Sequence, residues 1–386
     1  MPRNLRRILL LLVSVLVLGG LGYKFRNSIT LQGFQWSMVG DSLRHARIDL
    51  LLLSLVTIYA CFAIRALRWN RFSRWMGPSQ FGGTYAATLM GFTCTFLLGR
   101  AGEPIRPVLI ARKNSLSIPG MFGVYVLERI ADIAATVTIA ALALLLFRHH
   151  ESAGVDSTVV TKMRSGGAVL FVGLIFVIAF LIYFRFRGAA WLADKLKHPS
   201  WHEGWRAKLL ALLEGFSEGL QGIRTVGDLA ALIGYTAAHW FLVACCYLFI
   251  VHVFGGKLAT LSFANVILVL AFSLFGSAIQ LPGVGGGAQI ATFLALTVTF
   301  GVESGPAAVA SIIIWLITFA GCCLVGLPLL LKEGWSMGEL KQMAVAAEHK
   351  AEAVALSGQL PTPGNAPALD TNIETAFNKK KARDQQ

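Results

Sequence analysis

Six charged side chains lie within or beside strongly apolar stretches of this sequence, and their types and spacing could bind an anion. They form two groups, Arg100, Glu103 and Arg106 in residues 99–107, and Glu128, Arg129 and Asp132 in residues 126–132. A guanidinium can donate two parallel hydrogen bonds to one phosphate group. The pattern therefore predicts a site in which arginines bind the phosphate of a substrate, while carboxylates compete for those arginines or carry a proton.

The second group has the spacing of one helical face. On a helix, Glu128 and Asp132 lie one turn apart, and Arg129 lies beside Asp132. Because a charge inside a bilayer costs about 2.5–3.5 kcal/mol on insertion scales, three positive and three negative side chains are expected to pair with one another. Two interpretations stay open: a purely architectural ion-pair network, or the same network serving as a substrate-binding site.

Glycine and proline interrupt the apolar sequence at two places, one in each half of the chain. The first break holds Gly99, Gly102 and Pro104, and the second holds Pro282, Gly283, Gly285 and Gly286, followed by Gln289. Neither stretch can be continuous helix, because proline lacks an N–H and glycine is costly in a helix. Broken backbone at membrane depth is tolerated where it is buried in protein or lines a wet cavity. Paired breaks are typical of transporter binding sites, so we predict two re-entrant hairpins whose tips face each other.

The composition indicates which elements must hold these residues. Of the 386 residues, 55% are apolar and only 14% are charged, and the mean hydropathy is +0.65. A soluble domain has roughly 25% charged residues, so a soluble enzyme is excluded, and disorder is excluded for most of the chain. The predicted fold class is all-α, a polytopic transmembrane helical bundle with two re-entrant, broken helical hairpins.

About six full spans are expected, and the hairpin arms cover residues 81–98 and 261–300. The expected spans are residues 8–21, 50–64, 118–147, 166–184, 229–254 and 307–331. If each break instead separates two full spans, the number rises to ten. With hairpins, most of the 34 Lys and Arg fall on the side of both termini, which favours cytoplasmic termini and the cytoplasmic membrane. Residues 1–333 are the expected membrane domain, and residues 334–386 the expected cytoplasmic tail, a short helix followed by disorder.

Two arginine- or aromatic-rich segments, at residues 65–75 and 205–223, are expected to lie in the headgroup plane as anchors. His239 and His252 are expected to pack or to form hydrogen bonds. No metal-ligand spacing, ATP-binding motif or Ser/His/Asp set is readable, so no cofactor and no enzyme activity is expected. The basic residues that give the net charge of +14 are expected to face anionic lipid headgroups. The expected partners are therefore membrane lipids rather than nucleic acid.

Two motifs resemble those of the lysylphosphatidylglycerol synthase membrane-domain family, which includes stand-alone flippase-like proteins. The first is Phe-Leu-Leu-Gly-Arg-Ala-Gly-Glu-Pro-Ile-Arg-Pro at residues 96–107 with Val-Leu-Glu-Arg-Ile-Ala-Asp at residues 126–132. The second is Leu-Pro-Gly-Val-Gly-Gly-Gly-Ala-Gln at residues 281–289. The likeness covers about residues 5–333. It implies an integral membrane domain that moves phospholipid or a lipid-linked headgroup between leaflets.

By motif position, the six charged residues carry the charged signatures of that family. Gln289 stands where many relatives have Glu, so coupling to a proton or cation through that carboxylate is not implied here. The segment after the last span is too short for the aminoacyl-transfer domain of two-domain relatives. The function hypothesis is a non-enzymatic phospholipid translocase (flippase). A second copy and a separate lipid-synthesising enzyme are further candidate partners. The alternatives are a membrane enzyme, or an accessory or scaffold protein acting on anionic lipid.

Overall fold

The computed structural model describes residues 46–146, 225–281 and 285–334, together with a few single positions elsewhere. The predicted span at residues 8–21 lies outside this part of the chain, as do Pro282 and Gly283. Most of the predicted span at residues 166–184, the anchor at residues 205–223 except Ile223, and nearly all of the predicted tail lie outside it too.

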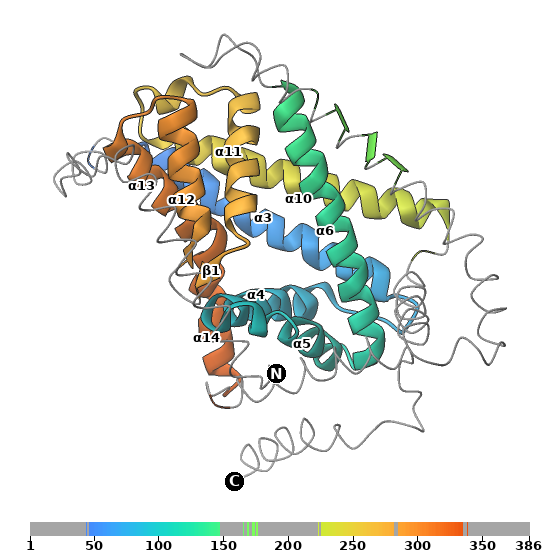
Figure 1. Cartoon of the computed structure of the whole chain (residues 1–386). Coiled ribbons are helices and arrows are strands. Elements are labelled where there is room, and N and C mark those ends of the chain that lie inside the picture. Colours follow the sequence, from blue (N-terminus) through green and yellow to red (C-terminus); the bar gives the residue numbers. More distant parts are fainter. Residues whose placement is uncertain are drawn as a thin grey trace, which may run out of the picture.

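The first half of the described chain is a long helix, a broken pair of helices and a second long helix. These are α3 (Ile48–Ser73), α4 (Phe81–Leu98), the 3₁₀ turn η1 (Gly99–Gly102), α5 (Ile105–Lys113) and α6 (Ile118–Leu146). Figure 1 shows α4 and α5 side by side beneath α3, with one end of α6 beside α5. The predicted first hairpin is therefore present as α4–η1–α5.

The second half repeats this order. It consists of α10 (Val226–Val253), η6 (Leu258–Thr260), α11 (Phe263–Gly276), β1 (Gln280–Leu281), β2 (Gly285–Gly286), α12 (Gly287–Leu294), α13 (Ser304–Trp315) and α14 (Cys323–Lys332). Two π-helical turns, η7 (Ala295–Thr299) and η8 (Leu316–Ala320), follow α12 and α13. The two short strands are antiparallel, with Gln280 opposite Gly286. They close the second hairpin, in which α11 packs against α12.

Local sequence sets where α10 and α11 begin. Thr225 accepts a hydrogen bond from the Asp228 backbone N–H, and the Asp228 carboxylate accepts one from the Thr225 N–H, both at 3.1 Å. This reciprocal capping box satisfies N–H groups that the first helical turn leaves unpaired. Ser262 caps α11 through a single hydrogen bond, which its hydroxyl accepts from the Asn265 N–H at 3.3 Å.

The predicted membrane-helical class is confirmed. Four described helical stretches are long and apolar enough to cross a bilayer: Ile48–Ser73, Phe81–Gly102, Val226–Val253 and Ser304–Lys332. By contrast, the arms of the second hairpin are shorter apolar helices, and at 1.5 Å per residue the 14-residue α11 is only about 21 Å long. A bilayer core is about 30 Å thick, so an arm of this length is too short to cross it. This favours a hairpin that enters the membrane and returns to the same side, rather than two further full spans.

Both predicted breaks interrupt the helices, and each depends on glycine. Gly99 ends α4 with a φ of +67°, a conformation that residues with a side chain rarely adopt. Pro104 immediately precedes α5, where its missing N–H costs nothing. At the second tip, a Cβ on Gly287 would collide with the backbone carbonyl of Gly276, so glycine allows α11 and α12 to approach closely.

The helices of the two halves pack in exchanged pairs. The first long helices, α3 and α10, lie along each other (Figure 1). In addition, α6 of the first half packs on α11 of the second, and α14 of the second half packs on α4 of the first. Swapping the two halves therefore leaves the pattern of contacts unchanged, which is the arrangement of an internal two-fold repeat.

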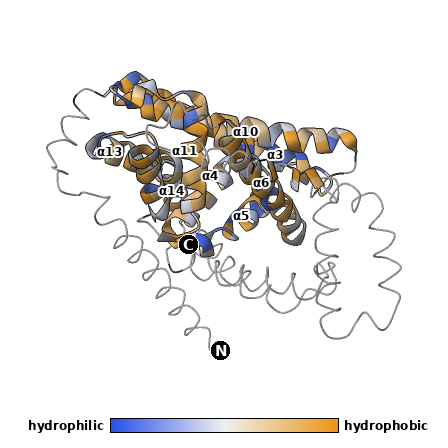
Figure 2. Cartoon of the chain, turned by 45° about the horizontal axis from the view of Figure 1, so that its top comes forward, coloured by the Kyte–Doolittle hydropathy of each residue, from blue (hydrophilic) through white to orange (hydrophobic). Residues whose placement is uncertain are grey.

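Apolar side chains dominate the helices and many of them face outward. Figure 2 shows the many hydrophobic residues along α10 and α11. Ile133, Phe241 and Leu331 are 64%, 59% and 66% exposed. Exposed apolar surface on this scale is what a lipid environment requires of a helix bundle.

The expectation that residues 65–75 form an interfacial anchor is wrong. Helix α3 does not end at residue 64 but continues to Ser73, and Arg68 and Trp69 are only 2% and 1% exposed. The physical reason is that acidic side chains of α6 neutralise the arginines, which can then lie inside the bundle.

Candidate functional site: an ionic cavity

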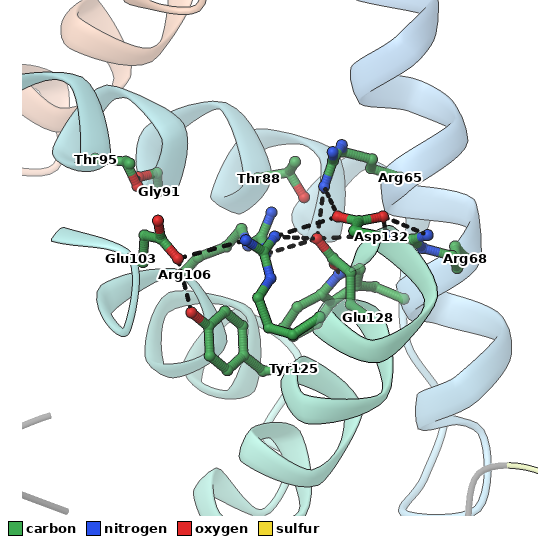
Figure 3. Close-up of polar contacts among 12 residues, drawn as sticks. Arg65, Arg68, Thr88, Gly91, Thr95, Glu103, Arg106, Tyr125, Glu128 and Asp132 are labelled. Carbon is green, nitrogen blue, oxygen red and sulfur yellow. Dashed lines mark hydrogen bonds and ion pairs between the residues drawn. The ribbon is translucent and has the colours of Figure 1, made fainter. Parts of the chain in front are cut away.

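Glu128 lies at the centre of an ion-pair cluster built from α3, α5 and α6 (Figure 3). Its Oε1 accepts hydrogen bonds from Arg65 Nη1 at 2.6 Å, Arg106 Nη2 at 2.8 Å and Arg129 Nη2 at 3.0 Å. Arg68 Nη2 lies 3.4 Å from the same oxygen. Four arginines thus converge on one carboxylate that is only 2% exposed.

Asp132 is the second acceptor of the cluster. It accepts from Arg65 Nη1 at 3.1 Å, Arg68 Nη1 at 3.2 Å and Arg129 Nη2 at 3.4 Å. Arg68 also donates to Thr236 Oγ1 of α10, at 3.0 Å. Glu128 and Asp132 therefore share one face of α6, which is the arrangement that their spacing predicts.

Arg106 is held from two sides. Its guanidinium carbon lies 4.7 Å from the Phe92 ring centre and 5.1 Å from that of Trp69, within cation–π range. Trp69 Nε1 donates to the second oxygen of Glu128. The approach of α5 to α4 depends on Gly91, where an added Cβ would lie 2.6 Å from the Cβ of Arg106. Arg106 is consequently fixed in position and 4% exposed.

Glu103 joins the cluster at its edge. Its Oε2 accepts from Tyr125 Oη at 2.8 Å and lies 3.4 Å from Arg129 Nη1. The Glu103 side chain is 30% exposed and Arg129 is 35% exposed, so both are more accessible than Glu128. This edge is the side from which a ligand could reach the cluster.

Arg100 does not take part in the ion pairs among the described residues. Instead, its Nη2 donates to the backbone carbonyl of Ala278 at 3.1 Å. Since Arg100 lies in η1 and Ala278 lies two residues after the end of α11, this hydrogen bond joins the tips of the two hairpins. Five of the six predicted charged residues thus form one cluster, and the sixth connects the two breaks.

Three residues of the site were missed by the sequence analysis. Arg65 and Arg68 follow an apolar run, and arginines in that position commonly mark the end of a span. His239 was expected only to pack or to form hydrogen bonds; its Nε2 accepts from Arg65 Nε at 3.2 Å and from Arg65 Nη2 at 2.9 Å. The signal that could have found the arginines is their i,i+3 spacing, which continues the helical face of the preceding apolar residues.

A cavity of about 560 Å³ lies against the exposed side of the cluster. Its arginine, carboxylate and histidine lining residues are Arg65, Arg100, Glu103, Arg129, Asp132 and His239. Apolar walls come from α4, α6 and η8, with Phe92, Ile133 and Phe319 among them. Ile133 is 64% exposed, so the cavity reaches the outer surface of the helix bundle. It therefore combines a charged end with walls on which apolar chains can lie.

The charges of the cluster do not balance. Among the residues that the structure describes, the ion pairs join four arginines, Arg65, Arg68, Arg106 and Arg129, to three carboxylates, Glu103, Glu128 and Asp132. The sequence predicted equal numbers, but Arg65 and Arg68 shift the sum to positive, and Arg100 adds another positive charge beside the cavity. A positive excess in an apolar surrounding is costly unless an anion completes it.

The glycines predicted as hinges, as far as they are described, lie at the two breaks between helices. Gly99 and Gly102 form η1, and Gly285 and Gly286 form β2. The side chain of Gln289 accepts a hydrogen bond from the Gly286 N–H, so it caps the start of α12. Within residues 46–146, 225–281 and 285–334, no group of three His, Cys, Asp or Glu side chains could hold a metal ion.

Comparison with known families gives a match over residues 8–326 to the family described as the lysylphosphatidylglycerol synthase TM region. The chain belongs to this family. The same comparisons gave no match among curated proteins and none among solved structures.

The family match, together with the four membrane-length helices, identifies a multi-pass integral membrane protein. The resemblance drawn from the two sequence motifs is thereby confirmed. The matched region includes both hairpins and every residue that lines the cavity.

Proposed function

We propose that this protein is a translocase that moves an anionic phospholipid, or a lipid-linked anionic headgroup, between the leaflets of the cytoplasmic membrane. The observation that carries the proposal is the positive excess at the cavity. The cluster has one arginine more than it has carboxylates, and Arg100 lines the same cavity without a carboxylate partner among the described residues. The phosphate of a lipid headgroup supplies the missing negative charge.

The shape of the cavity supports a lipid substrate rather than a free anion. The charged end lies beside apolar walls that extend to the lipid-facing Ile133. A headgroup can therefore meet Arg100 and Arg129 while its acyl chains stay in the bilayer. This arrangement needs no reacting group, so the proposal is of a transporter and not of an enzyme.

The two hairpins supply the element that moves. The Arg100–Ala278 hydrogen bond joins their tips, and both tips contain glycines that permit backbone rearrangement. A phosphate that binds Arg100 competes with the Ala278 carbonyl for the same guanidinium. Binding of the headgroup would then separate the tips and open a path along the cavity.

Leaflet exchange in liposomes tests the proposal. The purified protein is reconstituted with a fluorescent phosphatidylglycerol, and the fraction of label accessible to an impermeant quencher is followed over time. The wild type is expected to exchange the label. Arg100→Lys is expected to fold normally and to lose at least about tenfold in exchange rate, because an ammonium cannot bind phosphate with two parallel hydrogen bonds.

Arg47→Lys is the matched control, since Arg47 is 63% exposed, pairs with Asp49 and lies outside the cavity. It should exchange lipid at the wild-type rate. Exchange that is equally fast in the wild type, in Arg100→Lys and in empty liposomes contradicts the proposal. So does production of a chemically altered lipid without exchange, which would indicate an enzyme instead.

A further inference from the structure

Three residues that line the cavity each have a buried N–H group without a hydrogen-bond partner within the described part of the chain. The three groups are His239 Nδ1, Trp240 Nε1 and Arg129 Nε, and each of these atoms is buried. A buried donor that is left unpaired costs about 1–3 kcal/mol. Three such donors around one cavity are therefore a feature that needs a partner.

The hydrogen bonds of His239 determine which of its nitrogens carries the proton. Arginine has N–H donors and no acceptor, and Arg65 points two of them at His239 Nε2, at 3.2 and 2.9 Å. Nε2 must therefore be the acceptor, and the proton of the neutral imidazole lies on Nδ1. His239 is 4% exposed, so this N–H is a fixed, buried donor on a residue that lines the cavity.

The three donors belong to one end of the cavity. The ring centres of His239 and Trp240 are 5.4 Å apart. Arg65, which binds His239, also binds Glu128 Oε1 and Asp132 Oδ2, and Arg129 binds the same two oxygens. All three residues thus line the cavity close to where α3, α6 and α10 meet, and each has a covered N–H group that a ligand reaches when neighbouring side chains shift.

We propose that His239, Trp240 and Arg129 form a donor-only subsite that binds the unprotonated oxygens of a phosphodiester. This inference rests on the proposed function and assigns its substrate contact to a second set of residues, in addition to Arg100. A phosphodiester at neutral pH offers acceptors alone, and so it satisfies all three donors. An ammonium group offers donors alone, and is excluded from this subsite.

A binding measurement with two lipid probes tests the subsite. Full-length protein in detergent is titrated with short-chain phosphatidylglycerol, which has a phosphodiester, and with short-chain diacylglycerol, which lacks one. His239→Gln places a carbonyl oxygen where Nε2 accepts from Arg65 but removes the Nδ1–H donor, and Trp240→Phe removes the indole donor and keeps a ring. Each variant is expected to weaken phosphatidylglycerol binding about tenfold and to leave diacylglycerol binding unchanged.

His252→Gln is the matched control on the same helix. His252 Nε2 contacts the Leu261 carbonyl at 3.1 Å, and His252 does not line the cavity. The affinity of the His252→Gln variant for both lipid probes should equal that of the wild type. Thermal unfolding of each variant must stay near the wild-type midpoint, and if His239→Gln unfolds early, Trp240→Phe alone decides the result.

The outcomes separate the subsite from the transport proposal. If both cavity variants bind phosphatidylglycerol as tightly as the wild type, the subsite is refuted, even when the wild type exchanges lipid. If the variants lose phosphatidylglycerol binding but the wild type shows no leaflet exchange, the subsite stands and the translocase proposal fails. Equal loss for both probes would also refute the subsite, because it would show a general change of the cavity.

Discussion

Glu128 is the residue on which the stability of the site depends most. It accepts three hydrogen bonds from arginines through one oxygen, and it receives the Trp69 indole N–H through the other. A buried carboxylate is retained only when its partners compensate the cost of taking it out of water. Here the compensation is mutual, since the same carboxylate permits several arginines to be buried.

Glu128→Gln should therefore destabilise the protein strongly. The change removes the negative charge that Arg65, Arg68 and Arg106 share and replaces one of the two acceptor oxygens with an NH₂ donor, so we expect a loss of about 3–5 kcal/mol, as for other broken buried ion pairs. Thermal unfolding in detergent, followed by circular dichroism, measures this as a clear fall in the midpoint.

The exposed pair between Arg47 and Asp49 provides the control. Its side chains are 63% and 62% exposed, so Asp49→Asn should change stability by less than about 1 kcal/mol. Equal unfolding midpoints for Glu128→Gln and the wild type would show that the ion-pair cluster contributes little to the stability of the protein.

At the scale of elements, the contact between α4 and α5 depends on the absence of a side chain at Gly91. A Cβ there would overlap the Cβ and Cγ of Arg106. Gly91→Ala should push α5 away from α4 and cost about 1–3 kcal/mol, the usual range for an overfilled core. Because Arg106 moves with α5, the variant should also bind phosphatidylglycerol less tightly.

The same helix contains its own control. A Cβ at Gly82 meets no atom within 4 Å, so Gly82→Ala should leave stability unchanged or slightly raised, because alanine favours helix. Differential scanning fluorimetry of both variants compares them directly. A lower midpoint for Gly82→Ala than for Gly91→Ala would contradict the packing argument.

The sequence predicted the elements better than it predicted their partners. Charge-poor apolar stretches and the glycine–proline breaks located the described long helices and both hairpins, because a membrane leaves few alternatives to helices. The burial of Arg65 and Arg68 could not be predicted, since it depends on their pairing with α6 more than 50 residues later. For His239, the sequence predicted a hydrogen bond but could not identify Arg65 as its donor.

At the scale of the whole molecule, the two repeated halves meet where the Arg100 side chain bonds the Ala278 carbonyl. If the hairpin tips must separate for transport, joining them should stop it. Ala101 and Ala278 are both exposed beside this contact. Cysteines at these two positions, in a protein whose six native cysteines are replaced, should react with a flexible bifunctional thiol reagent and abolish leaflet exchange.

Each single-cysteine variant should keep its exchange rate after the same treatment, because one thiol cannot join the tips. The liposome assay with fluorescent phosphatidylglycerol reports both results. Full exchange by completely cross-linked protein would show that the tips stay together during transport.

The buried cluster also has a consequence for how the protein is made. Arg65 leaves the ribosome 63 residues before Glu128 and 67 before Asp132. Until α6 arrives, α3 carries two arginines toward the lipid interior without counter-charges, at about 2.5–3.5 kcal/mol each. Helices α3 to α6 must therefore enter the bilayer as one unit. In a chain truncated before Glu128, α3 is expected to stay at the membrane surface instead of inserting.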